Sequence, residues 1–394
     1  MIYCNNIITE DNEFSLTGEQ DDALDRIEAW YKAVQLSPAR QKFLVLSGAA
    51  GTGKSSLIRH VITRLGLPRQ DVACCAFTGK AALNINRKGA EACTLHSLMY
   101  RVERLSNGEF RFRRRDSIQQ RLVIVDEASM ISLELFEDLV HYGRPVIFIG
   151  DHHQLPPIDD GFSIMSSPDI VLHEIHRQAL ENPIIRQSQN VVNGIPIPYG
   201  GRDRRFRKIR LSELQEEDLA PPETSRQEAP QVLVGTNGSR KTFNSLIREL
   251  NGMSESSPPL AGEKMIVLRN NYKHNLFNGQ IVYLTSTPVR KRGKWLSTCQ
   301  DEMAVLDPSV AFYGVREKEI EFTLGGDRMD NAPQNELFMD YGYAITVHKA
   351  QGSQWDDAVI IDDGFGRGND SMRGRWLYTA ITRARRNVLL VTMN

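Results

Sequence analysis

Short, continuously apolar runs alternate with stretches of helical periodicity over most of this chain. The first four of these runs, FLVLSG (43–48), VACCAFT (72–78), LVIVDEA (122–128) and PVIFIGD (145–151), end in small or polar residues. The pattern resumes with QVLVGTN (231–237), YAITVHKAQG (343–352), DAVIID (357–362) and NVLLVTM (387–393). Such runs are typical of strands buried on both faces of a parallel sheet, with ligand-facing residues at their carboxyl ends. The pattern predicts an α/β fold with two parallel sheets, the second of which is interrupted.

The interruption has a different pattern. It follows two proline-containing connectors, LQEEDLAPPETSRQEAP (214–230) and NGMSESSPPLAGE (251–263). The segments EKMIVLRN, GQIVYLTSTPV, KWLST and EIEFTL then alternate apolar and polar residues, with turn residues between them. Alternation of this kind is typical of strands with one buried face. We therefore expect a small all-β insertion over residues 262–337.

Residues 100–116, YRVERLSNGEFRFRRRD, have the alternation of a β-hairpin. Their Asn-Gly pair is the strongest two-residue hairpin signal, because both turn positions need a positive φ. A turn at this pair places Arg104 opposite Arg111. Since side chains alternate across a strand, one face is then apolar and the other basic. The apolar face has Leu105, Phe110 and Phe112, and the basic face has Arg104, Arg111, Arg113 and Arg115.

Composition limits the choice of partners. A chain of 394 residues is too long for one ordinary core, which favours two or three domains. Its 48 Lys+Arg nearly balance its 49 Asp+Glu, so any site for a polyanion must be local. Three arginine-rich stretches, 111–115, 200–210 and 290–294, are either such contacts or solvated surface runs.

Cysteine usage and the N-terminal residues indicate a location. The five cysteines form no C-x-x-C pattern, which argues against a disulfide framework or a zinc site and favours a reducing compartment. The adjacent His152 and His153 cannot easily share one metal ion. The first residues are acidic, and no apolar stretch approaches the roughly 18 residues of a membrane span. We expect a soluble protein of the cytoplasm, bacterial or of a phage-infected host.

The stretch GAAGTGKSS (48–56) follows a predicted strand, precedes a predicted helix and fits G-x-x-x-x-G-K-[ST]. In such a P-loop, glycines allow backbone N–H groups to wrap phosphate oxygens at a helix N-terminus. We expect Lys54 to neutralise the β- and γ-phosphates and Ser55 to hold Mg²⁺. The complete nucleotide-binding set in this stretch is Gly48, Gly51, Thr52, Gly53, Lys54, Ser55 and Ser56.

Two further strand ends supply the rest of a hydrolytic site. LVIVDEAS (122–129) delivers Asp126 to the magnesium shell and Glu127 beside it, where the carboxylate can polarise an attacking water. FIGDHHQLPPI (148–158) places Gln154 where it can sense the γ-phosphate. The combination predicts a Mg²⁺-dependent nucleoside triphosphate hydrolase.

The order of these motifs resembles that of superfamily 1B DNA helicases, the group of the phage Dda helicases, the RecD-like helicases and the Pif-type helicases. Further matching blocks are SLTGEQDDAL (15–24), AFTGKAALNI (76–85), TLHSLMY (94–100), LHEIHRQ (172–178), DYGYAITVHKAQGSQWD (340–356) and WLYTAITRARRNV (376–388). The resemblance implies ATP as cofactor, with Gln20 reading adenine. It also implies that Arg177 and Arg383 act as arginine fingers. The alternative for Arg177 is that it forms an ordinary surface ion pair.

The resemblance also implies a domain organisation. Residues 1–170 form a RecA-like lobe 1A, with a pin hairpin (1B) at 99–118. Residues 171–261 and 338–394 form the two parts of a RecA-like lobe 2A. Residues 262–337 form an SH3-like insertion (2B). The fold expected is thus two RecA-like parallel-sheet lobes with a hairpin in the first and a small all-β insertion in the second.

Single-stranded DNA and single-strand/duplex junctions are the partners implied. Strand contacts are expected from loops of both lobes: Thr78, Lys80, Thr94, His96, Thr236, Asn237, Thr346, His348 and Lys349. The pin that separates the duplex is expected at Leu105, Asn107, Gly108, Phe110, Arg111, Phe112 and Arg113. A solvated hairpin whose aromatic residues pack on the lobe is the alternative.

The function implied is an ATP-dependent 5′→3′ DNA helicase, acting as a monomer with replication or recombination proteins. The polarity comes from the resemblance alone. Two alternatives remain open. One is the motor subunit of a nuclease or recombination complex. The other is an accessory single-strand-binding protein that uses ATP as a switch and does not unwind DNA.

Overall fold

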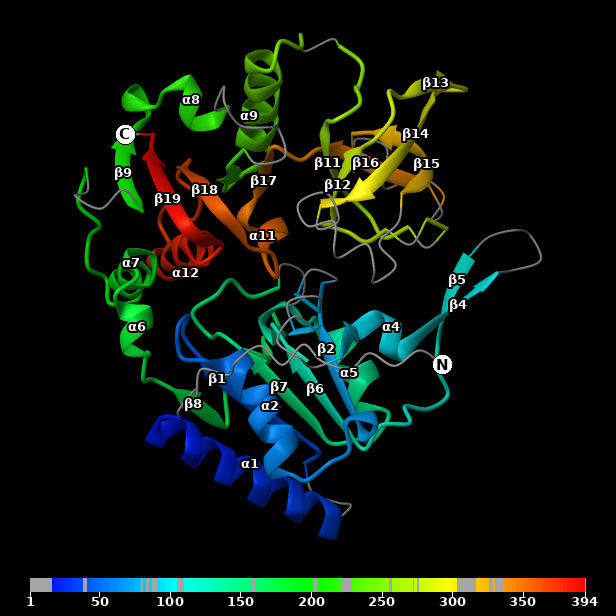
Figure 1. Cartoon of the computed structure of the whole chain (residues 1–394), viewed down its shortest axis with the longest axis vertical. Helices are drawn as coiled ribbons and strands as arrows, with labels where there is room; N and C mark the ends of the chain where they lie inside the picture. The colour runs from blue at the N-terminus through cyan, green and yellow to red at the C-terminus, as the bar shows by residue number, and fades with distance from the viewer. Residues whose placement is uncertain are drawn as a thin grey trace, which may run out of the picture.

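The structure is a computed structural model. It describes residues 16–37, 41–78, 81–82, 85–86, 91–104, 110–157, 161–200, 205–220, 229–254, 257–271, 273–274, 276–302, 317–325, 329, 333 and 336–393. Two parallel sheets and one mixed sheet account for most of the strands (Figure 1). No helix among these residues is long and apolar enough to cross a bilayer.

The first sheet is parallel, with the strand order β3-β2-β6-β7-β1-β8. Its strands are β1 (Phe43–Gly48), β2 (Val72–Ala76), β3 (Ala92–Thr94), β6 (Leu122–Asp126), β7 (Val146–Gly150) and β8 (Ile170–Leu172). Its helices are α1 (Gly18–Leu36), α2 (Lys54–Arg64), α4 (Leu95–Met99) and α5 (Leu133–Val140). Successive residues of a strand enter different cores. Leu44 and Leu46 pack with α1 and α2, and Val45 packs with α4 and α5.

The second sheet is also parallel, with the order β17-β10-β18-β19-β9. Its strands are β9 (Phe206–Arg210), β10 (Gln231–Val234), β17 (Ala344–Thr346), β18 (Trp355–Asp362) and β19 (Ala384–Thr392). The accompanying helices are α6 (Arg177–Leu180), α7 (Pro183–Val192), α8 (Glu216–Leu219), α9 (Asn237–Leu250), α11 (Val347–Ala350) and α12 (Asp370–Ile381). The two predicted parallel sheets are confirmed.

Short 3₁₀ helices occur in both lobes. They are η1 (Arg69–Asp71), η2 (Ala128–Met130), η3 (Ile164–Ser166) and η4 (Leu211–Glu213). The expected boundaries at 170 and 337 fall within β8 and β16 (Leu337–Tyr341). Strand pairing assigns β8 to the first sheet and β16 to the inserted sheet described next.

The interruption of the second lobe is a mixed sheet in the order β12-β11-β16-β15-β14-β13, closed by a pairing of β12 with β14. Besides β16 it contains β11 (Lys264–Val267), β12 (Ile281–Leu284), β13 (Val289–Lys291), β14 (Lys294–Asp301) and β15 (Lys318–Leu324). An apolar core fills this small barrel. The strands of the described part thus form one small barrel, and its SH3-like character stays a prediction.

The arginine-rich stretch 200–210 supplies the edge strand β9, which the sequence pattern did not predict. Phe206 and Ile209 are buried, whereas Arg207 and Arg210 are exposed. Phe206 and Ile209 enter two different cores, so each face of this strand buries one apolar side chain, and the arginines alternate with them.

The hairpin consists of β4 (Tyr100–Arg104) and β5 (Phe110–Arg114) and projects from the first lobe beyond α4 (Figure 1). Its register pairs Arg104 with Phe110 and Glu103 with Arg111. The predicted pairing of Arg104 with Arg111 is therefore wrong by one residue. This register does not fit a two-residue turn at positions 107 and 108, and residues 105–109 lie outside the described part. Because paired positions share a face, position 104 lies on the face of position 110 rather than with the arginines.

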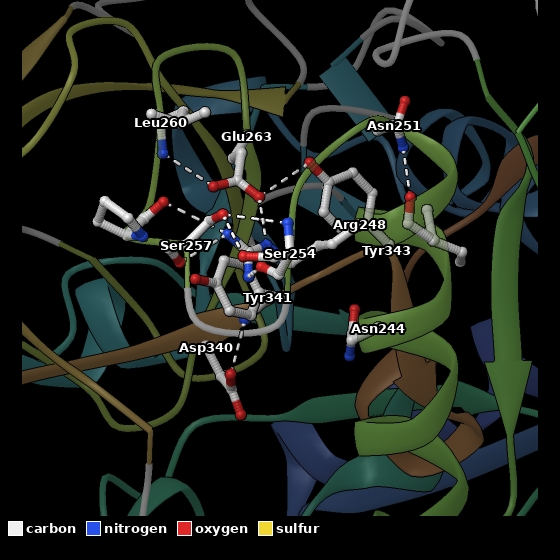
Figure 2. A network of polar contacts seen from close by, with 12 residues as sticks. Asn244, Arg248, Asn251, Ser254, Ser257, Leu260, Glu263, Asp340, Tyr341 and Tyr343 are labelled. Carbon is white, nitrogen blue, oxygen red and sulfur yellow. Dashed lines mark hydrogen bonds and ion pairs between the residues drawn. The ribbon is translucent and has the colours of Figure 1, made fainter.

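A buried polar network joins α9 to the barrel (Figure 2). The Arg248 Nε atom donates to Glu263 Oε1 over 2.8 Å, and the two side chains are 2% and 0% exposed. The guanidinium also donates to the carbonyls of Ser257, at 3.0 Å, and Pro258, at 3.3 Å. It lies 4.1 Å from the ring centroid of Tyr341. One side chain thus contacts the segment that enters the barrel and the strand that leaves it.

Candidate active site and strand groove

The P-loop connects β1 to α2. Gly51 and Gly53 have φ values of 89° and 76°, which favour glycine because other residues are strained there. A Cβ atom on Gly48 would lie 2.6 Å from Thr52 Oγ1. Thr52 itself is buried and donates from Oγ1 to the Ala49 carbonyl at 2.9 Å. The loop is thus closely packed around its own backbone.

Lys54 and the two serines begin α2. Lys54 Nζ donates to the carbonyls of Gly48, at 2.5 Å, and Ala49, at 2.7 Å, so the ammonium lies across the loop. Ser55 and Ser56 are partly exposed in the first turn of the helix. N–H groups of a first turn lack helical partners and suit phosphate oxygens.

The acidic pair follows β6. Asp126 is 8% exposed, and one of its oxygens accepts the backbone N–H of Glu127 at 2.9 Å. Glu127 has φ 55°, a left-handed conformation that is uncommon outside glycine. Removal from water raises the pKa of Glu127, and the nearby charge of Asp126 adds to this, whereas the charges of Arg383 and Lys54 act in the opposite direction. The structure therefore brings these four predicted residues to one place.

A Mg²⁺ ion fits the donor set at this place. Ser55 offers a hydroxyl and Asp126 a buried carboxylate, both oxygen ligands of the kind that Mg²⁺ prefers. The described residues include no group of three or more His, Cys, Asp or Glu arranged for a metal. His152 Nδ1 instead lies 2.7 Å from Ser47 Oγ.

Residues 151–155 are held between the lobes. Gln154 is buried, and its Oε1 accepts from Ser129 Oγ at 3.5 Å. In the next residue, Leu155, both the backbone N–H and the carbonyl form hydrogen bonds with the second lobe. Its N–H donates to Thr379 Oγ1 at 2.9 Å, and its carbonyl accepts from Gln351 Nε2 at 2.7 Å. The segment that carries Gln154 is therefore hydrogen-bonded to the second lobe.

Of the two predicted arginine fingers, the structure describes the side chain of only one. Arg383 is 2% exposed and donates from Nε to the Thr379 carbonyl at 3.1 Å and from Nη1 to the Ser353 carbonyl at 3.3 Å. Both bonds lie within the second lobe, and the Arg383 charge lowers the pKa of the Glu127 carboxyl group in the first lobe. Arg177 begins α6, but its side chain lies outside the part described, so its role stays a prediction.

Tyr378 is a site residue that the sequence reasoning missed. Its hydroxyl donates to Asp151 Oδ2 at 2.6 Å and accepts the N–H of the P-loop residue Ala50 at 2.7 Å. Burial, together with the charge of Asp151, raises the pKa of Tyr378 well above its usual value. The block WLYTAITRARRNV contained this tyrosine. Its contact with the P-loop depends on how the lobes pack, which no local pattern reports.

Gln20 lies against the P-loop. With Thr17 it forms a capping box at the start of α1, in which Thr17 N donates to Gln20 Oε1 at 3.0 Å. Gln20 Nε2 donates to the Thr52 carbonyl at 3.0 Å and is 2.9 Å from His176 Nε2. His176 was not predicted, and it also donates its backbone N–H to Gly51 at 3.2 Å. Reading of adenine by Gln20 stays a prediction.

Four of the predicted strand contacts are threonines that follow strands of either sheet. Thr94, Thr236 and Thr346 are the N-caps of α4, α9 and α11, and each accepts the N–H three residues on, at 3.2–3.4 Å. Thr78 accepts the N–H of Ala81 in the same way, at 3.2 Å. All four threonines thus accept the same kind of hydrogen bond and lie at the carboxyl end of a parallel strand, where ligands bind in such sheets.

The two lobes meet at these loops. Thr78 Oγ1 donates to the Gly352 carbonyl of the second lobe at 3.2 Å. Thr236 also bonds Asp363 Oδ2 at 3.0 Å. Asn237 Oδ1 accepts from Arg240 Nε at 3.2 Å.

The remaining predicted strand contacts are partly covered. His96 lies near the rings of Phe77 and Tyr100, with centroids 6.0 Å and 5.9 Å away. Burial lowers the pKa of His96 and that of His348, which favours neutral imidazoles. The Lys349 ammonium contacts Asn278 of the barrel. Lys80 lies outside the described residues.

The predicted pin is described only in part. Leu105, Asn107 and Gly108 lie outside the described residues, and for Phe110, Arg111 and Phe112 only the backbone pairing is described. Arg113 is exposed and forms an ion pair with Glu103 at 3.4 Å; Glu103 also contacts Arg101, at 3.1 Å. The basic strip of the hairpin thus contains a carboxylate that reduces its charge.

Comparison with known proteins adds an independent finding. Residues 31–160 match the model of an AAA domain, and residues 341–391 match that of a UvrD-like helicase C-terminal domain. The ATP-dependent RecD2 DNA helicase of Deinococcus radiodurans is 28% identical over 94% of this chain and 48% of its own length. The chain thus spans about half the length of that relative. The RecBCD enzyme subunit RecD of Mycobacterium tuberculosis (strain CDC 1551 / Oshkosh) is 24% identical, over 89% and 67%. The ATP-dependent DNA helicase Pif1 of Campylobacter jejuni is also 24% identical, over 86% of each.

Solved structures show the same fold. The Bacteroides Pif1 helicase in complex with ADP-AlF3 and ssDNA matches with a TM-score of 0.55 and 18% identity, over 97% of this chain and 93% of that one. Pif1 helicase from Candida albicans matches with a TM-score of 0.53 and 19% identity, over 97% and 95%. The resemblance to superfamily 1B helicases that the motifs predicted is thereby confirmed, as is the α/β fold with two parallel-sheet lobes.

Proposed function

We propose that this chain is an ATP-dependent DNA helicase that moves 5′→3′ along a single strand, as a monomer, and separates the duplex with the β4–β5 hairpin. The observation that supports this most directly is the composite nucleotide site. The charges of Lys54 in the first lobe and Arg383 in the second both act on the Glu127 carboxyl group. The Tyr378 hydroxyl of the second lobe accepts the N–H of the P-loop residue Ala50 at 2.7 Å. An active site divided between two lobes requires their closure, and closure can move a strand bound across both.

Each residue has a role in hydrolysis. Lys54 holds the β- and γ-phosphates, and Ser55 and Asp126 hold the Mg²⁺ that neutralises phosphate charge. Glu127 orients the attacking water and accepts its proton, which its raised pKa favours. Arg383 stabilises charge on the transferred phosphoryl group, because a guanidinium is planar and always charged. Gln154 senses the γ-phosphate from a segment bonded to the second lobe.

The strand is proposed to lie across the threonine-capped loops. Thr78 and Thr94 come from the first lobe, and Thr236 and Thr346 from the second. Contacts from opposite lobes change their separation when the lobes close, which is what translocation requires. His96 and His348, neutral beside aromatic rings, suit contacts with bases and sugars rather than with phosphates.

Duplexes with either a 5′ or a 3′ single-stranded tail test the proposal. We expect unwinding only from the 5′ tail, with hydrolysis of ATP stimulated by single-stranded DNA. Unwinding only from the 3′ tail would contradict the polarity. Lys54→Ala is the control and should lower stimulated hydrolysis by about 10²-fold or more, with an unchanged circular dichroism spectrum.

A second candidate is the motor subunit of a nuclease complex, which the similarity to RecD favours. The same assay separates the two, because a motor that requires partners would hydrolyse ATP on single strands without unwinding a tailed duplex alone. A pure ATP switch is less well supported. A protein that uses ATP only as a switch can lose its hydrolytic residues, so it does not need both Glu127 and Arg383.

A further inference from the structure

Cys75 and Cys93 lie side by side in the first sheet. β2 and β3 run parallel, and their register places Cys75 opposite Cys93. The two Sγ atoms are 3.6 Å apart and share a hydrogen bond. A disulfide has an S–S length of about 2.05 Å and spans Cα atoms about 4.4–6.8 Å apart. Neighbouring strands, about 4.8 Å apart, meet the second requirement, so a small shift of the two strands can bring the sulfurs together.

The two thiols differ in reactivity. Cys75 is fully buried, whereas Cys93 is partly exposed on the edge strand. A hydrogen bond from Cys75, the Ser97 hydroxyl and the charge of Arg115 lower the pKa of Cys93 to about 7. The same hydrogen bond raises the pKa of Cys75 well above its usual value. Since the thiolate is the nucleophile, Cys93 is the reactive sulfur at neutral pH and Cys75 keeps its proton.

The other described cysteines are poor competitors. Burial raises the pKa of Cys74 to about 11 and that of Cys299 to about 12. Neither has a thiol partner within hydrogen-bonding distance in the described part of the chain. Reaction with a small oxidant should therefore be selective for Cys93 among them.

We propose that Cys93 is a modification site for hydroperoxides and that Cys75 converts the product to a reversible disulfide between β2 and β3. The Cys93 thiolate attacks the peroxide, an S–O bond forms as the O–O bond breaks, and the sulfenic acid results. Cys75 then attacks the Cys93 sulfur, an S–S bond forms as the S–O bond breaks, and water leaves with the Cys75 proton. Two thiols lose two electrons in total, and hydrogen peroxide becomes two molecules of water.

The location links this chemistry to strand binding, a part of the inference that rests on the proposed function. Cys93 immediately precedes Thr94, the N-cap of α4, and Cys75 lies three residues before Thr78. A covalent link moves these two threonine loops relative to each other. Loss of one hydrogen bond to a phosphate would weaken single-strand binding about tenfold.

Mass spectrometry of the full chain tests the thiol chemistry without any activity measurement. The reduced protein is treated with hydrogen peroxide in the absence of DNA. We expect a loss of about 2 Da per disulfide, and a non-reducing tryptic digest should link peptide 70–80 to peptide 89–101. Failure to form this link would overturn the proposal.

Three variants separate the roles of the two cysteines. In Cys75→Ala the sulfenic acid at Cys93 should persist, with a gain of about 16 Da, and react with a dimedone probe. Cys93→Ser should give neither product. Cys299→Ser, a matched change at a buried thiol of the barrel, should react like the wild type. A Cys75→Ala protein that still forms a disulfide through Cys93 would contradict the role of Cys75.

Fluorescence anisotropy with a labelled single-stranded oligonucleotide tests the link to binding. The oxidised protein should bind about tenfold more weakly than the reduced protein, and a dithiol reductant should restore the affinity. A cross-linked protein with unchanged affinity would overturn control of strand binding by the pair. If the reduced protein itself fails to bind single strands, the proposed function is contradicted instead, while the mass data still decide the thiol chemistry.

Discussion

At the scale of single residues, Glu127 combines strain with an unfavourable charge. Its φ of 55° is uncommon outside glycine, and desolvation raises the pKa of its carboxyl group despite the charges of Arg383 and Lys54. A raised pKa means that the folded state binds this proton more tightly than the unfolded chain does. The free energy of unfolding therefore decreases as the pH rises through the pKa. The charged form that the proposed role in hydrolysis needs is thus the form that the fold disfavours.

Glu127→Gln should separate catalysis from stability. The amide cannot accept the proton of the attacking water, so hydrolysis should fall by about 10²–10⁴-fold. Because the amide carries no charge, the variant should melt at a higher temperature than the wild type at pH 8, with a smaller difference at pH 5. Steady-state hydrolysis and differential scanning calorimetry at both pH values measure this. Glu134→Gln, on the exposed side of α5, is the control and should change neither quantity. A lower melting temperature for Glu127→Gln at pH 8 would contradict the assignment.

Tyr378 links the second lobe to the P-loop through one hydroxyl group. Tyr378→Phe removes the donor to Asp151 and leaves the Ala50 N–H without its acceptor. A buried polar group without a partner costs about 1–3 kcal/mol. We expect lower thermal stability and, because the link spans the lobes, a larger decrease in kcat than change in KM for ATP with single-stranded DNA present.

Tyr31→Phe is the matched control for Tyr378. Tyr31 is also buried, but its hydroxyl has no hydrogen-bond partner among the described residues. Removal of that hydroxyl should leave stability the same or slightly higher, with unchanged kinetics. If both variants behave alike, the contact of Tyr378 with the P-loop has no role in hydrolysis.

At the scale of elements, the hairpin has a firm base. The N–H of Arg115 donates to the Met99 carbonyl at 2.8 Å, and Arg114 forms an ion pair with Asp138 of α5 at 2.7 Å. The Tyr100 hydroxyl also bonds Asp138. These contacts fix the base independently of the tip. The tip can therefore be altered without loss of the five backbone pairs between β4 and β5.

Replacement of residues 105–109 by the dipeptide Asn-Gly should shorten the tip and preserve the pairing of Arg104 with Phe110. A two-residue turn closes an antiparallel pair in register. If the hairpin separates the duplex, unwinding should fall sharply while hydrolysis stimulated by single strands is retained. A five-residue Gly/Ser loop, which keeps the length but removes the side chains, shows whether reach or chemistry matters. Equal unwinding by all three proteins would exclude a role for the tip.

The parallel strands were predictable because each is a continuous apolar run that ends in polar residues. β3 and β8 were not, since three residues carry no periodicity. β9 was concealed by its basic residues, because Phe206 and Ile209 are its only apolar residues and, three apart, they do not alternate as one apolar face does. The predicted register of the hairpin was wrong by one residue, because an Asn-Gly pair favours a turn but does not fix the loop length.

The residues of the candidate site also divide into those that a local sequence predicts and those that it does not. The P-loop and the acidic pair are local sequences, so their positions in the fold were predictable, while their roles stay predictions. The contacts of Tyr378, His176 and Leu155 join segments more than 100 residues apart, and only the packing of the lobes creates them.

At the scale of the whole molecule, buried polar contacts of two consecutive residues, Glu263 and Lys264, attach the barrel to the second lobe. Glu263 pairs with Arg248 of α9 (Figure 2). Lys264 pairs with Glu302 at 3.0 Å, and Glu302 accepts from Trp355 Nε1, at the start of β18, at 3.0 Å. Both pairs are almost inaccessible to water, so their geometry is fixed by the packing around them. The barrel and the second lobe are therefore expected to move as one body when the lobes close.

A double-mutant cycle on Arg248 and Glu263 tests this attachment. Removal of one partner leaves a buried charge unpaired, so Arg248→Met and Glu263→Gln should each destabilise the protein by about 3–5 kcal/mol. The double variant should recover part of this loss, with an interaction energy of about 2–3 kcal/mol measured by urea unfolding. The exposed pair Arg386–Asp356, 2.7 Å apart, is the matched control and should couple by less than about 1 kcal/mol. In the double variant, hydrolysis stimulated by single strands should persist while unwinding falls, because the barrel is no longer held in one orientation. Full unwinding by that variant would show that the attachment stabilises the fold without directing the motion.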